Sequence, residues 1–155
     1  MASAAEGKPG GSGKEPAWLA GKPLNEWFAI KGTGGSGGAP VGDFSGMTVK
    51  ESASEVWIAA AGGHGGSADN RVVSIDLCAD APQWVQRCAP SPQPAQNVAY
   101  NADGKPASRH TYQSTLYVDP LDRVMLFGCR FTWPGAHEFP KVDGFDPKKN
   151  AWDPA

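Results

Sequence analysis

The chain has 155 residues and a formal net charge of −2, with 14 lysines and arginines against 16 aspartates and glutamates. It has no basic stripe of the kind that binds nucleic acid, and no apolar stretch near the roughly 20 residues that span a bilayer. We therefore expect neither a nucleic-acid partner nor membrane insertion. The first residues contain no apolar core of a signal peptide, which leaves a cytoplasmic and a secreted location both open.

Polar and glycine-rich sequence surrounds one apolar segment in the N-terminal part of the chain. Residues 1–16 show no apolar periodicity, which predicts a flexible arm. Within residues 17–42, the run 25–30 fits one strand, and a short amphipathic helix over 17–29 is the alternative. The glycines of 32–37 have the spacing of a dinucleotide-binding loop, but no helix follows them, so we expect a glycine-rich linker there.

Three cysteines are present, Cys78, Cys88 and Cys129, and none belongs to a CxxC pair, so a zinc knuckle is not expected. Two interpretations stay open. Either all three are reduced, partly buried thiols, or Cys78 and Cys88, which flank a predicted hairpin, form a disulfide. A disulfide would imply an oxidising compartment.

Residues 109–155 contain the clearest strand and turn signals. Val124-Met125-Leu126-Phe127 is a continuous apolar run closed by Gly128, which predicts a strand buried on both faces. A buried helix is disfavoured because Pro120 and Gly128 leave too few residues for one. Asp119-Pro120 and Asp146-Pro147 predict tight turns, so we expect a four-stranded antiparallel meander.

Residues 43–88 are an earlier copy of this pattern, and residues 89–108, rich in Pro, Gln, Asn and Ala, are an insertion between the copies. Landmarks of the two copies recur at nearly constant spacing, which indicates an internal repeat. The spacing is 66 residues for Asp43 and Arg109, 68 for Val56 and Val124, 70 for Asp76 and Asp146, and 68 for Trp84 and Trp152. We expect strands near 43–50, 55–61, 71–77, 83–88, 109–118, 122–128, 141–146 and 150–153. The side chains expected in the core are Val56, Trp57, Ile58, Trp84, Val124, Leu126, Phe127 and Trp152.

The later copy resembles a kelch repeat, one blade of a β-propeller. The likeness lies in Arg109-His110, the apolar strand that ends at Gly128, the turn Phe145-Asp146-Pro147 and Trp152, with Gly62-Gly63 in the earlier copy. The resemblance implies an all-β fold of kelch-type β-propeller blades, each a four-stranded antiparallel meander, in an incomplete ring. Residues 43–88 would be blade 1, 109–155 blade 2, and the strand within 17–42 a closing strand. Propellers have about 4–8 blades, so the remaining blades would come from the same longer chain or from other chains.

The expected meander places its long loops and all three histidines at one face. The loop between the second and third strands of each copy and the insertion 89–108 lie at the same end of the sheets, opposite the tight turns. Long loops on a rigid sheet are the usual place for a site, so we expect any ligand at this face. The candidate ligand-binding residues are His64, Asp69, Arg109, His110, Arg130, Trp133 and His137. For the histidines the alternative is a structural role, and for Trp133 it is a role in covering the core.

No signature of a catalytic or metal site is visible. His137-Glu138 lacks the second histidine of an H-E-x-x-H motif, and there is no serine nucleophile elbow, paired-carboxylate signature or phosphate loop. We therefore assign no catalytic residues and expect no cofactor.

The resemblance implies a binding or scaffold module whose partner is a protein or a carbohydrate. One alternative is part of a galactose-oxidase-like enzyme, whose catalytic residues would lie outside this segment. A second alternative is a structural protein of a surface or a virion. Copper is expected only under the enzyme alternative.

Overall fold

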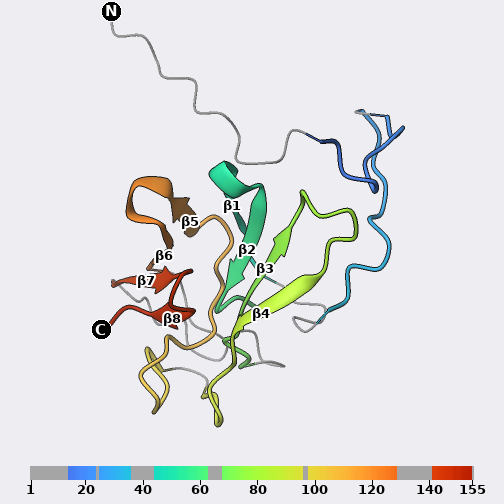
Figure 1. Cartoon of the computed structure of the whole chain (residues 1–155). Helices are drawn as coiled ribbons and strands as arrows, with labels where there is room; N and C mark the ends of the chain where they lie inside the picture. The colour runs from blue at the N-terminus through green and yellow to red at the C-terminus, as the bar shows by residue number, and fades with distance from the viewer. Residues whose placement is uncertain are drawn as a thin grey trace, which may run out of the picture.

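The computed structural model describes residues 14–23, 25–35, 44–62, 68–95, 98–128 and 141–154, and within them the fold is all-β. Eight strands form two four-stranded antiparallel sheets (Figure 1). Sheet 1 contains β1 (Thr48–Lys50), β2 (Glu55–Ala59), β3 (Val72–Asp76) and β4 (Trp84–Cys88). Sheet 2 contains β5 (Thr115–Val118), β6 (Arg123–Phe127), β7 (Val142–Asp146) and β8 (Ala151–Trp152). Two single-turn 3-10 helices, η1 (Glu51–Ala53) and η2 (Asp119–Leu121), join the first two strands of each sheet.

All eight predicted strands are present, although β1 and β5 begin later in the chain than expected. The order of the strands in each sheet follows their order in the sequence, so each sheet is a meander. None of the helices in the described residues is long and apolar enough to span a membrane.

The hydrogen-bonded registers of the two sheets are equivalent. Val56 on β2 pairs with Val49 on β1 and Ile75 on β3. Val124 on β6 pairs in the same way with Tyr117 on β5 and Phe145 on β7. The outer pairs correspond as well, because Ile75 pairs with Trp84 and Phe145 with Trp152. The predicted spacings of 68 residues at Val56 and Trp84 therefore hold in the structure.

Backbone conformation repeats at the same spacing. Six residues with positive, left-handed φ angles form three pairs whose members are 68 residues apart. The pairs are Phe44 and Tyr112, Ser54 and Asp122, and Ala60 and Gly128. Residues other than glycine rarely adopt this backbone conformation. Its recurrence at three equivalent pairs therefore shows that the turns are repeated as well as the strands. Tyr112 thus matches Phe44, and the predicted match of Asp43 with Arg109, at 66 residues, is wrong by two positions.

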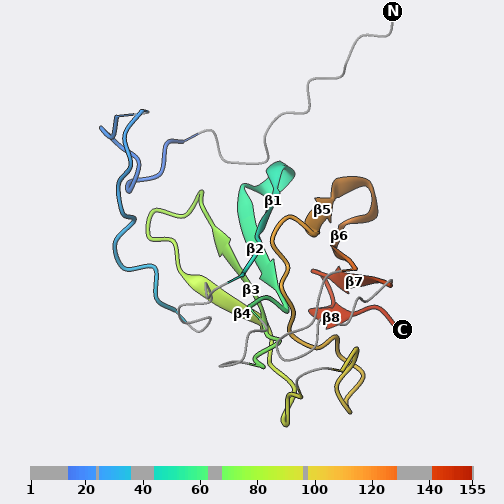
Figure 2. The same cartoon turned by 180° about the vertical axis from the view of Figure 1, so that it is seen from behind.

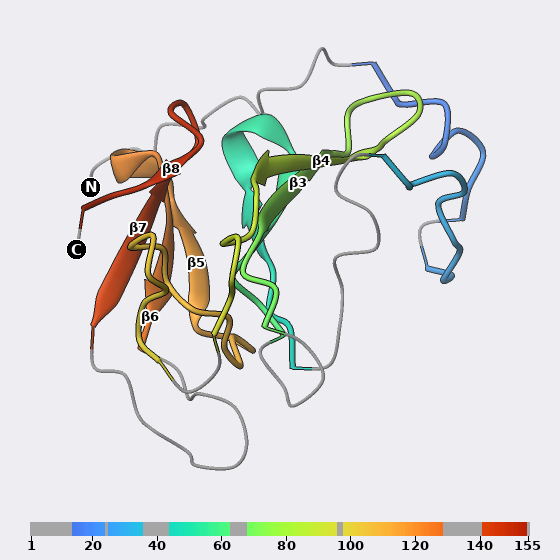
Figure 3. The same cartoon turned by 90° about the horizontal axis from the view of Figure 1, so that it is seen from below.

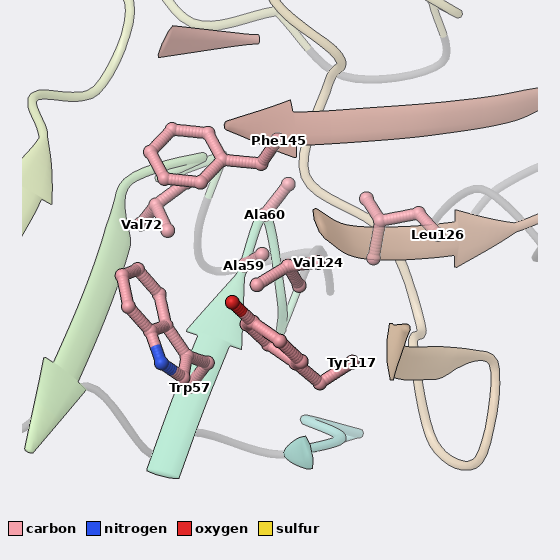
Figure 4. Packing of buried hydrophobic residues seen from close by; sticks show 8 residues of the cluster. All are labelled: Trp57, Ala59, Ala60, Val72, Tyr117, Val124, Leu126 and Phe145. Atoms are coloured by element: carbon pink, nitrogen blue, oxygen red, sulfur yellow. The ribbon is translucent and has the colours of Figure 1, made fainter. Parts of the chain in front are cut away.

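The main hydrophobic core lies between the two sheets, which pack face to face (Figure 3). Sheet 1 contributes Trp57, Ala59 and Val72, and Ala60 follows β2; sheet 2 contributes Tyr117, Val124, Leu126 and Phe145 (Figure 4). The ring of Trp57 fills the centre, with its centroid 6.2 Å from that of Phe145 and 6.5 Å from that of Tyr117. Burial of these large apolar side chains is the main term that holds the two sheets together.

The first strands of the two sheets are also joined by polar contacts. The backbone N–H of Tyr117 on β5 donates to the buried hydroxyl of Thr48 on β1 over 2.7 Å. Nearer the loops, the N–H of Gly46 donates to the hydroxyl of Thr111 over 2.7 Å. These bonds satisfy backbone donors on facing strands and fix how the sheets meet.

The prediction of a core strand buried on both faces is wrong for β6. Val124 and Leu126 face sheet 1 and are buried, whereas Phe127 is 44% exposed. Successive side chains of a strand point to opposite faces, so Met125 and Phe127 are on the face turned away from sheet 1. Trp84 and Trp152 are half-buried, and Trp152 contacts the edge of Phe145 at 5.4 Å between ring centroids.

Among the described residues of 17–30 there is neither the strand predicted at 25–30 nor the alternative helix. Residues 16–20 form one turn, and the side chain of Trp27 is fully exposed. The segment 14–35 runs beside sheet 1 on the side away from sheet 2 (Figures 1 and 2). It is held there by the indole N–H of Trp18, which donates to the carbonyl of Leu77 over 3.0 Å, and by backbone contacts near Trp84. The arm predicted over 1–16 falls largely outside the described residues.

Cys78 and Cys88 are both free thiols, so the disulfide alternative is not realised. Cys88 packs against the core between the sheets, and burial raises the pKa of its thiol. Cys129 lies outside the described residues.

Candidate functional site

The insertion 89–108 lies at one end of the two sheets, and the other two predicted long loops fall largely outside the described residues. Residues 89–95 and 98–108 extend beyond the ends of β4 and β5, while η1 and η2 lie at the opposite end (Figure 1). The insertion is folded back on itself, because the N–H of Ala107 donates to the carbonyl of Ala99 over 3.0 Å and Tyr100 forms a bridge with Pro106. We call the surface formed by these residues the loop surface.

Arg109 is the residue that ties the loop surface to the sheets. Its side chain is 0% exposed and forms an ion pair with Asp143 on β7, with 3.2 Å between Nη1 and Oδ2. The guanidinium also donates to the carbonyls of Ala99, Ala107 and Gly128 at 3.1–3.4 Å. A buried guanidinium whose donors meet these partners positions the backbone around it, so Arg109 supports the loops from below instead of contacting a ligand.

Tyr100 adds a second contact to the same carboxylate. Its hydroxyl donates to Oδ1 of Asp143 over 2.8 Å. Burial and this hydrogen bond raise the pKa of Tyr100 to about 12. Asp143 therefore accepts a hydrogen bond from Tyr100 on one oxygen and pairs with Arg109 through the other, and so it anchors the second half of the insertion and the residue after it to sheet 2.

Asn70 holds the insertion to sheet 1. The side chain is fully buried, and its amide nitrogen donates to the hydroxyl of Ser91 over 3.0 Å and to the carbonyl of Pro106 over 2.8 Å. Its amide oxygen accepts the N–H of Ser91 over 2.8 Å. The hydroxyl of Ser91 donates in turn to Asp103 over 2.8 Å, which lowers the pKa of Asp103 although burial opposes that shift.

Asp69 forms a local ion pair. Its carboxylate accepts the backbone N–H of Arg71 over 2.9 Å and pairs with the guanidinium of the same residue, with about a third of each side chain exposed. The hydrogen bond to Asp69 raises the pKa of Arg71. Ala60 connects this pair to Arg109, since its N–H donates to the carbonyl of Arg71 and its carbonyl accepts the N–H of Arg109.

His110 belongs to a small aromatic group. Its ring stacks on Phe44 with 4.4 Å between centroids, and Tyr112 meets it edge-on at 5.7 Å. The side chain is half-buried and joins the strand that enters sheet 2 to the segment that precedes β1. This packing is the structural role that the sequence left open for His110.

The structure links the segments of Asp69 and Arg109 through the backbone of Ala60, and His110 follows Arg109 in the chain. It engages Asp69 and Arg109 in ion pairs and His110 in ring stacking. The other four candidates, His64, Arg130, Trp133 and His137, lie outside the described residues. In the described part of the chain, no three His, Cys, Asp or Glu side chains are grouped to hold a metal ion.

Sequence reasoning missed Asn70, Tyr100 and Asp143, whose hydrogen bonds and ion pair attach the insertion to the sheets. For Asp143 a signal existed. It has the same parity as Phe145 along β7, so strand alternation places its carboxylate on the core-facing side, where an ionised group requires a partner.

A second polar cluster, also missed, joins the sheets at the opposite end. Asp122, at the end of η2, accepts hydrogen bonds from Lys50 over 2.8 Å and from the hydroxyl of Tyr117, and pairs with Lys148 at 2.8 Å. The contacts with Lys148, Lys50 and Tyr117 hold the pKa of Asp122 well below its usual range. Burial and the hydrogen bond to Asp122 raise the pKa of Tyr117 to about 12. These groups satisfy one another, so we interpret the cluster as a clamp between the sheets.

Comparison of the chain with protein-family models, with curated proteins and with solved structures finds no significant match to any of them.

Proposed function

We propose that this chain supplies two blades of a kelch-type β-propeller that serves as a binding or scaffold module for a protein or a glycan. Two meanders with equivalent registers support the blade assignment, because a propeller is built from such units packed face to face. Three kelch-like landmarks also support it. Gly128 follows the end of β6, Phe145 packs in the core, and Trp152 lies on β8.

The observation that carries the binding role is the fixed geometry of the loop surface. Arg109, Asn70 and Asp143 connect the insertion to both sheets through buried and part-buried polar bonds. A loop that is ordered before its ligand arrives loses little conformational entropy on binding. Rigid scaffolds with long loops at one end are where binding residues are concentrated.

Exposed side chains of the loop surface provide the test. Gln93 and Ala102 are exposed on the insertion, and Glu51 is exposed at the opposite end of the sheets. The full chain is screened against a panel of immobilised glycans and a peptide library, and each binder is measured again with Gln93→Arg, Ala102→Arg and Glu51→Arg. Because a new arginine adds bulk and charge where it is placed, we expect at least a tenfold loss of affinity from one of the first two and none from the third.

Equal affinity for all three variants would exclude the loop surface as the binding site. Stoichiometric copper together with production of hydrogen peroxide from a sugar alcohol would replace the proposal with the oxidase alternative.

A further inference from the structure

Sheet 2 has an apolar face that sheet 1 does not cover. On this face Leu116 is 53% exposed, Phe127 44% and Val142 52%. Leu116 pairs with Met125 and Phe127 pairs with Val142, so the four side chains stand on the same side of three adjacent strands. We call this the outer face of sheet 2. A continuous apolar surface across three strands is typical of an interaction site.

The internal repeat shows what covers such a face. The equivalent positions in sheet 1 are Thr48, Trp57, Ala59 and Val72. All four are buried, with Thr48 the most accessible at 7%. They are buried against the inner face of sheet 2, formed by Tyr117, Val124, Leu126 and Phe145. The chain thus packs the outer face of one unit against the inner face of the next.

We infer that the outer face of sheet 2 is a docking surface for a further four-stranded sheet of the same repeat type, which presents an inner face like that of sheet 2. The partner is thus an antiparallel sheet with Tyr, Val, Leu and Phe, or similar apolar residues, at the positions of Tyr117, Val124, Leu126 and Phe145. It is oriented relative to sheet 2 as sheet 2 is oriented relative to sheet 1. This deepens the proposed function and rests on its repeat arrangement, not on its ligand.

A second copy of the chain offers little of the required surface. The inner face of sheet 2 is already occupied by sheet 1. The equivalent face of sheet 1 contains Ile58 and Ile75, which are buried, Val56, which is half-buried, and Val49, which is 47% exposed. A further unit of the repeat presents a whole inner face, whereas a second molecule packed head to tail presents only the edge around Val49, so we take the occupant to be a further unit.

The side chains of the outer face define the fit. Relative to sheet 1, Met125 replaces Trp57 at the centre and Phe127 replaces Ala59 at the loop end. The largest side chain of the outer face therefore lies nearer the loops in sheet 2 than in sheet 1. The thioether of Met125 faces the position where the partner's equivalent of Tyr117 would pack, and contacts between sulfur and an aromatic ring are favourable. Leu116 replaces Thr48 and has no acceptor, so the bond from the backbone N–H of Tyr117 to Thr48 has no counterpart. The contact is more apolar than that between sheets 1 and 2.

The experiment adds such a unit to the full chain. Residue 155 corresponds to residue 87 at the spacing of 68, so a second copy of residues 88–154 is appended directly after Ala155. Phe127→Asp is made in the natural chain and in the extended chain. The matched control is the same substitution at the equivalent phenylalanine of the appended copy, whose own outer face is not covered by a further sheet. Thermal melting and analytical ultracentrifugation are measured for all five proteins, including the unsubstituted natural chain.

We expect Phe127→Asp to shift the melting temperature of the natural chain by about 2 °C or less, because the side chain is exposed. In the extended chain the same change is expected to lower it by about 10 °C, because a carboxylate is then buried against the added sheet. The control substitution should resemble the natural chain. Leu116→Asp, on the same face, should repeat the pattern.

Equal shifts in the natural and extended chains would overturn the inference. It would also be overturned if the natural chain formed dimers that Phe127→Asp converted to monomers, because the outer face would then be an interface between copies. Neither result depends on ligand binding at the loop surface, so this proposal and the proposed function fail separately.

Discussion

Arg109 and Asp143 are paired in the interior of the protein, with 3.2 Å between Nη1 and Oδ2 and with 0% and 8% of their side chains exposed. The two residues lie 34 positions apart, one at the entrance to sheet 2 and one on β7. The same guanidinium donates to the carbonyl of Ala99 in the insertion and to that of Gly128 after β6, so the pair connects both to β7. It is the strongest single reason to regard the loop surface as rigid.

Removal of the arginine is the first test of that rigidity. Arg109→Ala leaves the carboxylate of Asp143 buried without its cation, which typically costs about 3–5 kcal/mol. The control is Arg71→Ala, which breaks the pair with the partly exposed Asp69 and should cost about 1 kcal/mol or less. Denaturant unfolding of both variants provides the comparison. Similar losses would show that the Arg109 pair is not desolvated.

The core between the sheets predicts a contrast between two phenylalanines. Phe145 is fully buried against Trp57, whereas Phe127 is exposed on the outer face. Phe145→Ala should cost about 3–5 kcal/mol in the free energy of unfolding, and Phe127→Ala less than about 1 kcal/mol. Chemical denaturation of the natural chain measures both. The reverse order would mean that the register of β6 and β7 is displaced by one residue.

Asp122 predicts a dependence of stability on acid. Its pKa is lowered in the folded state, first by Lys148 and then by Lys50 and Tyr117. A carboxyl group of this kind adds stability above its unfolded pKa of about 4, and that stability is lost as pH falls through the folded value. We expect Asp122→Asn to destabilise the chain at pH 7 and to flatten the decline of its unfolding free energy below about pH 4. Asp80→Asn, at an exposed carboxylate, is the control and should change the free energy of unfolding at pH 7 by less than about 1 kcal/mol.

Tyr117, which is buried, and Tyr100, which is half-buried, predict how the stability changes at alkaline pH. The pKa values of Tyr100 and Tyr117 are both raised to about 12, mainly by burial. The folded state then keeps protons that the unfolded chain releases above about pH 10, so the stability from these groups is present below that pH and lost between about 10 and 12. Ultraviolet difference spectra of Tyr100→Phe and Tyr117→Phe should each lack one late phenol transition. A transition near pH 10 for both residues in the natural chain would contradict their burial.

Local sequence was sufficient to locate the strands and turns. Val124-Met125-Leu126-Phe127, Asp119-Pro120 and the recurring tryptophans report on the backbone within a few residues, where side-chain branching and proline geometry dominate. The repeat followed from the same information applied twice, and the paired left-handed residues Ser54 and Asp122 confirm it. The segment 25–30 has no second copy to compare it with, and its apolar residues predict a strand that the structure does not contain.

Burial and the role of each charged side chain were decided only by tertiary structure. Phe127 and Leu126 are neighbours with the same apolar character, and only the presence of sheet 1 on one side buries Leu126 and leaves Phe127 exposed. The sequence makes Arg109 a candidate ligand contact, whereas the structure pairs it with Asp143. Ion pairs between distant residues depend on how two sheets meet, and the energy that selects them arises from removing both charges from water, which no local pattern encodes.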